Sequence, residues 1–450
     1  MKSYELKQRT VPMDDSWDVI VAGGGPAGCT AAIAAAREGA KTLLLEATGC
    51  LGGMGTSGLI PAWCPFSDKE RVIYAGLGEQ IMEKVKSTMP HVPKTLVDWV
   101  PIDPEMLKVV YDDMVSESGA QVLFNTFLSG VETDGEGNVT AVLASNKDGL
   151  CAYRAKVYID CTGDGDLAVW AGAQFEQGGP DGELQPGSLC FVLSNVDSYA
   201  YTYGVRLHGA NPDSPVHRMA KSDKYPYVKD SHMCNNFIGP ATVGFNAGHV
   251  FGVDNTKPAN LTEALMTGRK LARNMRDGLA EYFPEAFGNS FLVQTGSLMG
   301  IRETRRVIGD YYLTREDFVA RTTFADEIAR NCYYIDVHNT REEADKMAKG
   351  ELSFKEVMDK VAVHYDRGES HGIPYRCLTP KGLRNVLLAG RSVSSDRIIN
   401  GSLRVMPVCL AMGEAAGAAA AMATHTDGDV RKVDVQELRS KLQKAGAYLP

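Results

Sequence analysis

The chain has 450 residues, of which 44% are hydrophobic and 23% are charged, the composition of a soluble globular protein. Its formal net charge of −9 argues against a nucleic acid or an anionic membrane surface as a partner. Because the length exceeds that of one ordinary core, we expect two closely connected domains.

An apolar strand over 19–22 runs into a glycine cluster near the start of the chain. An alanine-rich helix is predicted over 30–38, and a second apolar strand over 41–45 ends on Glu46. Strand, glycine turn, helix, strand and acid in this order form the dinucleotide-binding fingerprint.

Each part of this fingerprint has a physical role. Gly23 permits the tight turn, Gly25 lets the backbone approach a pyrophosphate, and Gly28 allows the helix to pack closely on the strand. The free N–H groups at the start of the helix attract phosphates. Glu46 lies about 20 residues further on, where a carboxylate accepts hydrogen bonds from ribose hydroxyls.

Helix and strand patterns continue along the next hundred residues. Asp103 and Pro104 predict the start of a helix that reaches about residue 118. Residues 121–133 and 139–144 predict a β-hairpin, because Asp, Gly and Asn between them are turn residues. Another apolar strand is predicted over 155–159.

From about 175 to 375 the βα rhythm is lost, and aromatic, Asn and His residues become denser. The alternation of strand and helix patterns resumes at 384–391, and a long helix of small residues follows. We therefore predict a discontinuous nucleotide-binding domain made of 1–175 and 376–450. Residues 176–375 would mainly form an inserted cap, with 293–310 a candidate to return to the active site.

Three later features favour FAD over NAD. The glycine-rich loop 51–58 can lie flat against a large planar ligand. Thr162-Gly163-Asp164 follows a strand, an arrangement that flavoproteins use where the chain passes the nucleotide again. A helix start near 404–408, together with Arg404, would stabilise negative charge on a reduced flavin.

The chain resembles the FAD-dependent oxidoreductases of the glutathione-reductase superfold, in a branch of bacterial flavoproteins described as xanthan-lyase-like. The resemblance covers nearly the whole chain. Besides the glycine turn with Glu46, it is carried by motifs at 51–56, 159–167, 253–263, 300–306, 335–338, 373–378, 388–391, 401–407 and 413–417.

The resemblance implies an α/β fold: a discontinuous, Rossmann-like FAD-binding domain (GR2-type) with an inserted α+β cap, and FAD as the cofactor. It places Leu128 against the adenine, and Gly53 to Thr56 along the ribityl chain and the isoalloxazine. The predicted cofactor-binding residues are Gly23, Gly25, Pro26, Ala27, Gly28, Glu46, Ala47, Gly52, Gly53, Met54, Thr56, Leu128, Thr162, Gly163, Asp164, Gly390, Arg391, Arg404, Val405 and Met406.

One position departs from related flavoproteins. Many carry an acid after the glycine of the C-terminal motif, where it binds a ribityl hydroxyl, whereas this chain has Arg391. Arg391 could face the pyrophosphate instead, so its role is open.

The sequence has no second strand followed by G-x-G-x-x-G and no C-x-x-C pair. We therefore expect no resident NAD(P)H domain of the disulfide-reductase type. The electron donor or acceptor would be a substrate, a quinone, oxygen or another protein. A small-molecule substrate is expected, and a homodimer is compatible with this size and superfold.

The ten cysteines are scattered and the nine histidines show no metal-binding spacing, so we expect reduced thiols and no metal site. The first residues lack the apolar run of a secretory signal. The apolar stretch 405–423 contains Pro407 and Glu414 and is predicted to be a buried helix rather than a membrane span. Together these features predict a cytoplasmic protein.

Five residues are candidates for the chemistry. Arg302 and Arg305 belong to a dense charged cluster beside a glycine, and an arginine there could fork onto a substrate carboxylate or a flavin oxygen. An interdomain salt bridge is the alternative. His249 and His338 are proton-transfer candidates, because histidine titrates near neutral pH, although either could be structural. Arg404 completes the set.

We predict an FAD-dependent oxidoreductase that transfers a hydride between flavin N5 and a small polar organic substrate, with the direction open. An alcohol or amine dehydrogenation would use His249 or His338 as the base. A fumarate-reductase-like ene reduction would use Arg302 or Arg305 as the proton donor. From a different class, a flavin-binding structural or assembly module without turnover is the alternative.

Overall fold

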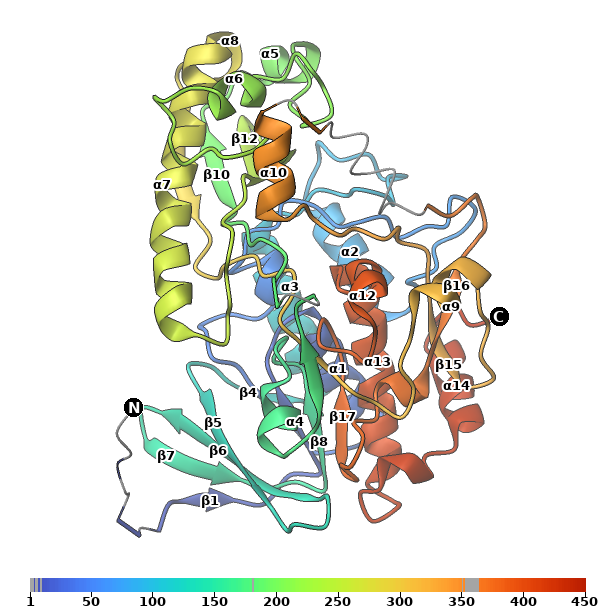
Figure 1. Ribbon diagram of the computed structural model, residues 1–450. Helices are drawn as coiled ribbons and strands as arrows, with labels where there is room; N and C mark the ends of the chain where they lie inside the picture. Colours follow the sequence, from blue (N-terminus) through green and yellow to red (C-terminus); the bar gives the residue numbers. More distant parts are fainter. Residues whose placement is uncertain (1–3, 5–6, 9, 180–181, 350, 353–363) are drawn as a thin grey trace.

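Five parallel strands form the sheet that carries the glycine-rich turn (Figure 1). The computed structural model describes the chain except for residues 1–3, 5–6, 9, 180–181, 350 and 353–363. Because the carboxyl ends of parallel strands share one edge, the turns after the central strands meet there. In order across the sheet the strands are β17 (Val386–Leu388), β8 (Val157–Asp160), β2 (Val19–Ala22), β3 (Thr42–Leu45) and β4 (Gln121–Leu123).

A second sheet covers one face of the parallel sheet. Ile20 and Leu43 of that face pack in one core with Val142 and Tyr153 of the second sheet. Its strands, in order, are β1 (Met13–Asp14), β7 (Gly149–Tyr153), β6 (Val139–Asn146) and β5 (Phe127–Thr133).

The predicted hairpin is confirmed for β5 and β6, which pair antiparallel. The prediction that 121–123 belong to the same strand was wrong, because these residues form β4 of the parallel sheet. The chain turns between β4 and β5 at Asn125, whose φ is 51°. Asparagine tolerates this left-handed conformation better than most residues, so one apolar run is divided between two sheets.

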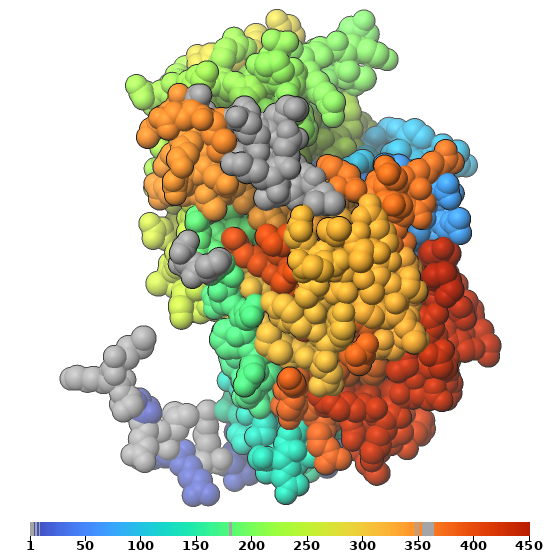
Figure 2. Space-filling view, turned by 45° about the vertical axis from the view of Figure 1, so that its right-hand side comes forward, coloured from blue at the N-terminus to red at the C-terminus, as the bar shows by residue number. Residues whose placement is uncertain are grey.

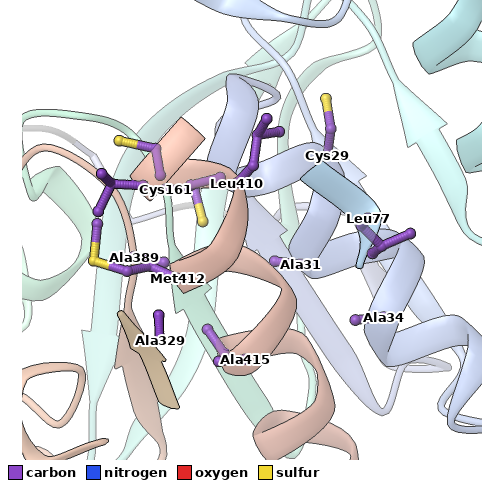
Figure 3. Packing of buried hydrophobic residues seen from close by; sticks show 14 of the residues in the cluster. Cys29, Ala31, Ala34, Leu77, Cys161, Ala329, Ala389, Leu410, Met412 and Ala415 are labelled. Atoms are coloured by element: carbon purple, nitrogen blue, oxygen red, sulfur yellow. The ribbon is translucent and has the colours of Figure 1, made fainter. Parts of the chain in front are cut away.

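Helices cover the opposite face of the parallel sheet. α3 (Pro104–Ser118) starts as predicted, since the Asp103 carboxylate accepts hydrogen bonds from the N–H groups of Glu105 and Met106. α1 (Pro26–Arg37) and α13 (Met406–Ala423) pack on each other, and Figure 3 shows side chains of both, including Ala31 and Leu410, in one cluster. A Cβ at Gly417 would lie 2.1 Å from the Ala31 carbonyl oxygen, so small residues are required where these helices touch.

Among the described residues, α13 is long and apolar enough to cross a membrane by length and composition, but 89% of it is buried inside the protein. It is the core helix that the sequence predicted.

Glu414, on α13, is a carboxylate in the protein core. It is 3% exposed and accepts a 2.9 Å hydrogen bond from the N–H of Leu77, at the start of α2 (Leu77–Ser87). Burial raises the pKa of Glu414 to about 7. The folded protein therefore holds this proton more tightly than the unfolded chain does, and the resulting stability is complete below about pH 4.5 and is lost as the pH rises through about 7.

We predict that Glu414→Gln, which keeps an acceptor for Leu77, raises the free energy of unfolding at about pH 8 by up to about 3 kcal/mol. The difference from the wild type should shrink as the pH falls toward 5. Denaturant unfolding of both proteins across this range measures it, and parallel curves at all pH values would contradict the prediction.

The cap is built on a four-stranded antiparallel sheet: β11 (Met233–Gly239), β12 (Thr242–Ala247), β10 (Phe191–Ser194) and β13 (Phe291–Thr295). The long helix α7 (Pro258–Tyr282) packs in the same core, which runs from Leu189 to Ile301. Three short helices complete this end of the molecule (Figure 1): α5 (Ser198–Tyr203), α6 (Val216–Ala220) and α8 (Pro284–Phe287).

Residues 305–335 and 365–375 pack with the nucleotide-binding part. β14 (Arg305–Val307) pairs with β9 (Phe175–Gln177), β15 (Glu327–Asn331) pairs with β16 (His371–Pro374), and Phe318 packs in the same core as α1 and α13. Figure 2 shows the yellow-orange part of this segment directly against the red C-terminal segment. Residues Leu189–Ile301 share one core, and we propose these bounds for the cap in place of the expected 176–375. Pairing between such distant strands leaves no local signal in the sequence.

Four further helices belong to the nucleotide-binding part: α4 (Asp166–Trp170), α9 (Arg315–Ala320), α12 (Arg397–Leu403) and α14 (Val435–Lys444). Short 3-10 helices lie at Gly53–Gly55, Tyr375–Cys377 and Val430–Lys432. In contrast, α10 (Arg341–Ala348) lies at the cap end of the molecule (Figure 1).

Candidate active site

A cavity of about 2000 Å³ lies between the glycine-rich turn and the cap. Ordinary ligand pockets have about 300–1,000 Å³, so this one has room for a dinucleotide and a second molecule. All five predicted catalytic residues line it: Arg302, Arg305, Arg404, His249 and His338. The predicted cofactor residues line it as well, except for Gly28, Gly52 and Thr56.

The glycine turn leaves an open cradle at one end of the cavity. Gly23 has a φ of +94°, and a Cβ at Gly28 would lie 1.8 Å from the Gly23 carbonyl oxygen, so the close approach of helix and strand needs both glycines. At Gly25 nothing lies within 4 Å of the Cβ position. No side chain caps α1, and its first N–H groups are free for a phosphate. This cradle fits the pyrophosphate of FAD.

Glu46 stands beside the cradle with both oxygens engaged. Oε2 accepts a 2.7 Å hydrogen bond from the Gly24 N–H, and Oε1 accepts one of 2.7 Å from the Thr48 N–H. Each carboxylate oxygen keeps a second lone pair, which a ribose hydroxyl in the cavity can use.

Gly28, Gly52 and Thr56 support the cavity wall from behind. The Gly52 N–H donates to the Gly24 carbonyl at 2.8 Å, and the Thr56 hydroxyl donates to the Leu51 carbonyl at 2.6 Å. From this loop, Gly53 and Met54 face the cavity.

Arg391 lies in the wall, but its guanidinium is occupied. It donates to the carbonyl oxygens of Gly163 and Ile301 at 3.1 and 2.9 Å, and it contacts Asp164 Oδ1 at 2.5 Å. Asp164 also accepts from the Thr304 hydroxyl at 2.5 Å. Arg391 therefore ties together the crossing after β8 and the end of the cap.

Four side chains form a row in the cap half of the cavity. His249 Nδ1 lies 2.6 Å from Asp230 Oδ2, and His249 Nε2 lies 2.9 Å from His338 Nδ1. At the other end, His338 Nε2 lies 3.5 Å from Asp336 Oδ1. The two predicted histidines, 89 residues apart in sequence, are thus adjacent and have a carboxylate at either end.

The protons available to this row identify its reactive atom. Two neutral imidazoles carry two ring protons, and the two short contacts use both: His249 donates to Asp230, and His338 donates to His249. His338 Nε2 then keeps a free lone pair, in agreement with its longer separation from Asp336. A third proton would complete the row as one imidazolium between two carboxylates, which stabilise it.

Both rings are neutral in the free protein at neutral pH. Burial and the charge of Arg302 lower the pKa of His338 to about 3, and burial lowers the pKa of His249. Burial alone would raise the pKa of Asp230, but the charge and hydrogen bond of His249 bring it below its ordinary value. With both rings neutral, His338 has a lone pair that can accept a proton, but burial and the charge of Arg302 make it a weak base in the free protein.

His232 stacks on His249, with ring centroids 4.2 Å apart and an interplanar angle of 16°. One nitrogen each of His232, His249 and His338 lie within 4.8 Å of one another, close enough to consider a shared metal ion. However, the lone pairs of two nearly parallel stacked rings do not converge on one ion, as tetrahedral coordination requires. The geometry therefore favours a proton-transfer row over a metal centre.

The three predicted arginines occupy different positions. Arg404 donates to the carbonyl oxygen and Oδ2 of Asp336 at 2.8 and 3.2 Å, at the end of the row. Arg302 is buried near the row and lowers the pKa of His338 through its charge. Arg305 instead pairs with Asp166 at 2.8 Å, near the carboxyl edge of the parallel sheet.

The FAD dependent oxidoreductase family matches residues 18–442. The chain belongs to this family. It is therefore an enzyme, an oxidoreductase with FAD as its cofactor, and the predicted cofactor and fold class are confirmed. The alternative of a flavin-binding module without turnover is set aside.

The comparison with solved structures finds proteins of low similarity. A geranylgeranyl bacteriochlorophyll reductase-like protein of Thermoplasma acidophilum is 14% identical over 97% of this chain and 85% of its own, with a TM-score of 0.48. The OxyS anhydrotetracycline hydroxylase of Streptomyces rimosus is 13% identical over 95% and 68%, with a TM-score of 0.44. A flavin-dependent brominase is 11% identical over 95% and 83%, with a TM-score of 0.46. These comparisons carry no information on the substrate.

Asp230 and Asp336 belong to the candidate site, but sequence reasoning did not select them. It considered His232 only as a weaker candidate for proton transfer than His249 and His338. Asp336 lies two residues before His338, inside a motif that the sequence analysis singled out. Asp230 had no such signal, because it precedes β11 and reaches His249 only through the folding of the cap sheet.

Proposed function

We propose that this enzyme oxidises the CH–OH group of a small polar substrate and that His338 Nε2 accepts the hydroxyl proton. The observation that carries the proposal is the row Asp230–His249–His338–Asp336, which lines the cavity. A general base needs a lone pair in the site, which His338 has. The charge of Asp336 raises the pKa of His338, whereas burial and the charge of Arg302 lower it.

When bound, FAD supplies the hydride acceptor, flavin N5. The protein holds it through the cradle at Gly23–Gly28, Glu46, the loop at Gly53 and Met54, and the start of α13. His249 and Asp230 orient His338 and share the positive charge that forms on it. Arg404 holds Asp336 in place for the same purpose.

A fumarate-reductase-like ene reduction is the second candidate, and one observation favours it. Burial and the charge of Arg404 lower the pKa of Arg302 to about 10, the direction that a proton donor requires. The two candidates differ in the state of the flavin that reacts, since an alcohol would reduce oxidised flavin and an enoate would reoxidise reduced flavin.

We predict that the oxidised holoenzyme is bleached anaerobically by one or more members of a panel of polyols, sugars and hydroxy acids. Deuterium on the reacting carbon should slow this bleaching several-fold, because the C–H bond breaks in the step. Stopped-flow absorbance near the flavin bands measures both rates. If no alcohol bleaches the flavin while enoates reoxidise the photoreduced protein, the oxidation is refuted in favour of the ene reduction.

The finer assignments rest on the sequence and form part of this proposal. They are the xanthan-lyase-like branch, a cytoplasmic location and a homodimer. An external electron acceptor that reoxidises the flavin belongs to the same group.

A further inference from the structure

Arg302 differs from the other buried or half-buried arginines of the cavity wall. Arg305, Arg391 and Arg404 each contact a carboxylate, those of Asp166, Asp164 and Asp336. Arg302 is only 5% exposed. Among the residues that the structure describes, no carboxylate oxygen lies within 4.0 Å of its guanidinium.

The contacts of Arg302 are all with neutral oxygens. It donates to the Pro186 carbonyl at 2.7 Å, to the Ser188 hydroxyl at 3.1 Å and, at 3.5 Å, to the Asn246 side-chain carbonyl. These contacts hold the guanidinium in place without neutralising it. A buried charge without a counter-ion carries a large desolvation penalty, which an anion can offset.

The electrostatics of the site agree with this geometry. Burial and the charge of Arg404 lower the pKa of Arg302 to about 10, while the charge of Asp336 acts in the opposite direction. The carboxylates of Asp230 and Asp336 are held by His249 and Arg404, so they are not available as partners. The Arg302 guanidinium, which has no carboxylate partner, is therefore a candidate anion-binding group inside the cavity.

We propose that Arg302 binds a carboxylate of the substrate and that the substrates are small hydroxycarboxylates. The claim that the substrate carries a hydroxyl group rests on the proposed oxidation. The claim that Arg302 binds a carboxylate does not depend on it. A planar guanidinium matches a carboxylate with two parallel hydrogen bonds, so it fixes orientation as well as charge. Arg302 lines the same cavity as His338, and its partner Asn246 lies on β12 three residues before His249.

A bound carboxylate would also assist the base. The charge of Arg302 is the largest single charge that lowers the pKa of His338. When a substrate carboxylate neutralises Arg302, the proton affinity of His338 rises, and the base becomes stronger only once the substrate is in place. A neutral alcohol of the same shape would gain neither the ion pair nor the stronger base.

The test compares carboxylates with their neutral amides on the FAD-loaded enzyme. Acetate with acetamide and malonate with malonamide probe binding without turnover, through perturbation of the flavin absorption spectrum. Lactate with lactamide and glycolate with glycolamide add the hydroxyl group. We expect the wild type to prefer each carboxylate by about 10- to 100-fold, the effect of one charge-assisted contact.

In Arg302→Gln this preference should fall below about threefold, while Arg302→Lys should keep part of it. Arg276→Gln is the matched control, because Arg276 lies on α7 of the cap outside the cavity wall and should leave the preference unchanged. FAD content and the flavin reduction potential are measured for each variant. A loss of preference at unchanged potential supports substrate binding.

Three outcomes would overturn the inference. The first is a wild type without preference for carboxylates. The second is an unchanged preference in Arg302→Gln, and the third is a changed flavin potential with the preference intact, which would assign Arg302 to the cofactor. If carboxylates bind through Arg302 but no hydroxycarboxylate bleaches the flavin, the anion site stands and the proposed oxidation falls. If only neutral alcohols bleach it, the oxidation stands and the anion site falls.

Discussion

Replacing His338 with Gln is expected to slow reduction of the flavin by substrate about 10²- to 10⁴-fold, the range for loss of a general base. The amide has no lone pair of comparable basicity at the position of His338 Nε2, so the hydroxyl proton has no acceptor when the C–H bond breaks. FAD should stay bound, because His338 lies in the cap half of the cavity and not at the glycine cradle. Stopped-flow absorbance with a substrate that bleaches the wild type measures the rate.

A matched variant separates this effect from damage to the cap. His217→Gln also replaces a cap histidine, but His217 contacts the Asn211 carbonyl and lies outside the cavity wall, so its rate should equal that of the wild type. His249→Gln should lose less than His338→Gln, since His249 acts through His338. Added imidazole should restore part of the rate of His338→Gly. A wild-type rate in His338→Gln would remove it as the base.

The pH dependence follows from the same group. Burial and Arg302 hold the pKa of His338 to about 3, so the base is neutral and competent above that value and is lost only below it. The rate at low substrate concentration, which reports the free enzyme, should therefore show no decline from His338 between about pH 8 and 5. A decline with an apparent pKa near 6.5 that disappears in His338→Gln would show an unperturbed histidine instead.

The cofactor half of the molecule was readable from the sequence because its signals are local. One short stretch contains the glycine turn, the buried strands β2 and β3 and the acid Glu46. Each of them has a residue type that is required locally, either by the space available or by a hydrogen bond. The start of α3 was equally readable, since Asp103 caps the helix that follows it directly.

The catalytic half was only partly readable, because its geometry depends on distant segments. The sequence selected His249 and His338 separately, and only the fold shows that they share a hydrogen bond. Asp230 reaches His249 through the cap sheet, and β14 pairs with β9, which lies far earlier in the chain. Residue types alone could not show that Arg305 has a carboxylate partner whereas Arg302 does not.

The glycine cradle offers a sharper test of the cofactor site than activity does. We expect Gly25→Val to lose FAD while the protein remains folded. Nothing of the protein lies within 4 Å of the Cβ position at Gly25, and its φ of −71° suits any residue, so a side chain there causes no clash and no strain. It would, however, fill the space in front of the α1 N–H groups, where the pyrophosphate approaches the backbone.

The measurement is flavin content per protein, followed by FAD titration of the apoprotein. An affinity loss of at least about 100-fold, equal to about 2.7 kcal/mol, is expected if the phosphates are displaced from the helix start. Gly49→Val is the control, because Gly49 also has nothing within 4 Å of its Cβ position but lies outside the cavity wall.

Gly28→Val should instead unfold this region, since its Cβ would meet the Gly23 carbonyl at 1.8 Å. Full FAD binding by Gly25→Val would place the pyrophosphate away from the glycine turn and contradict the cradle.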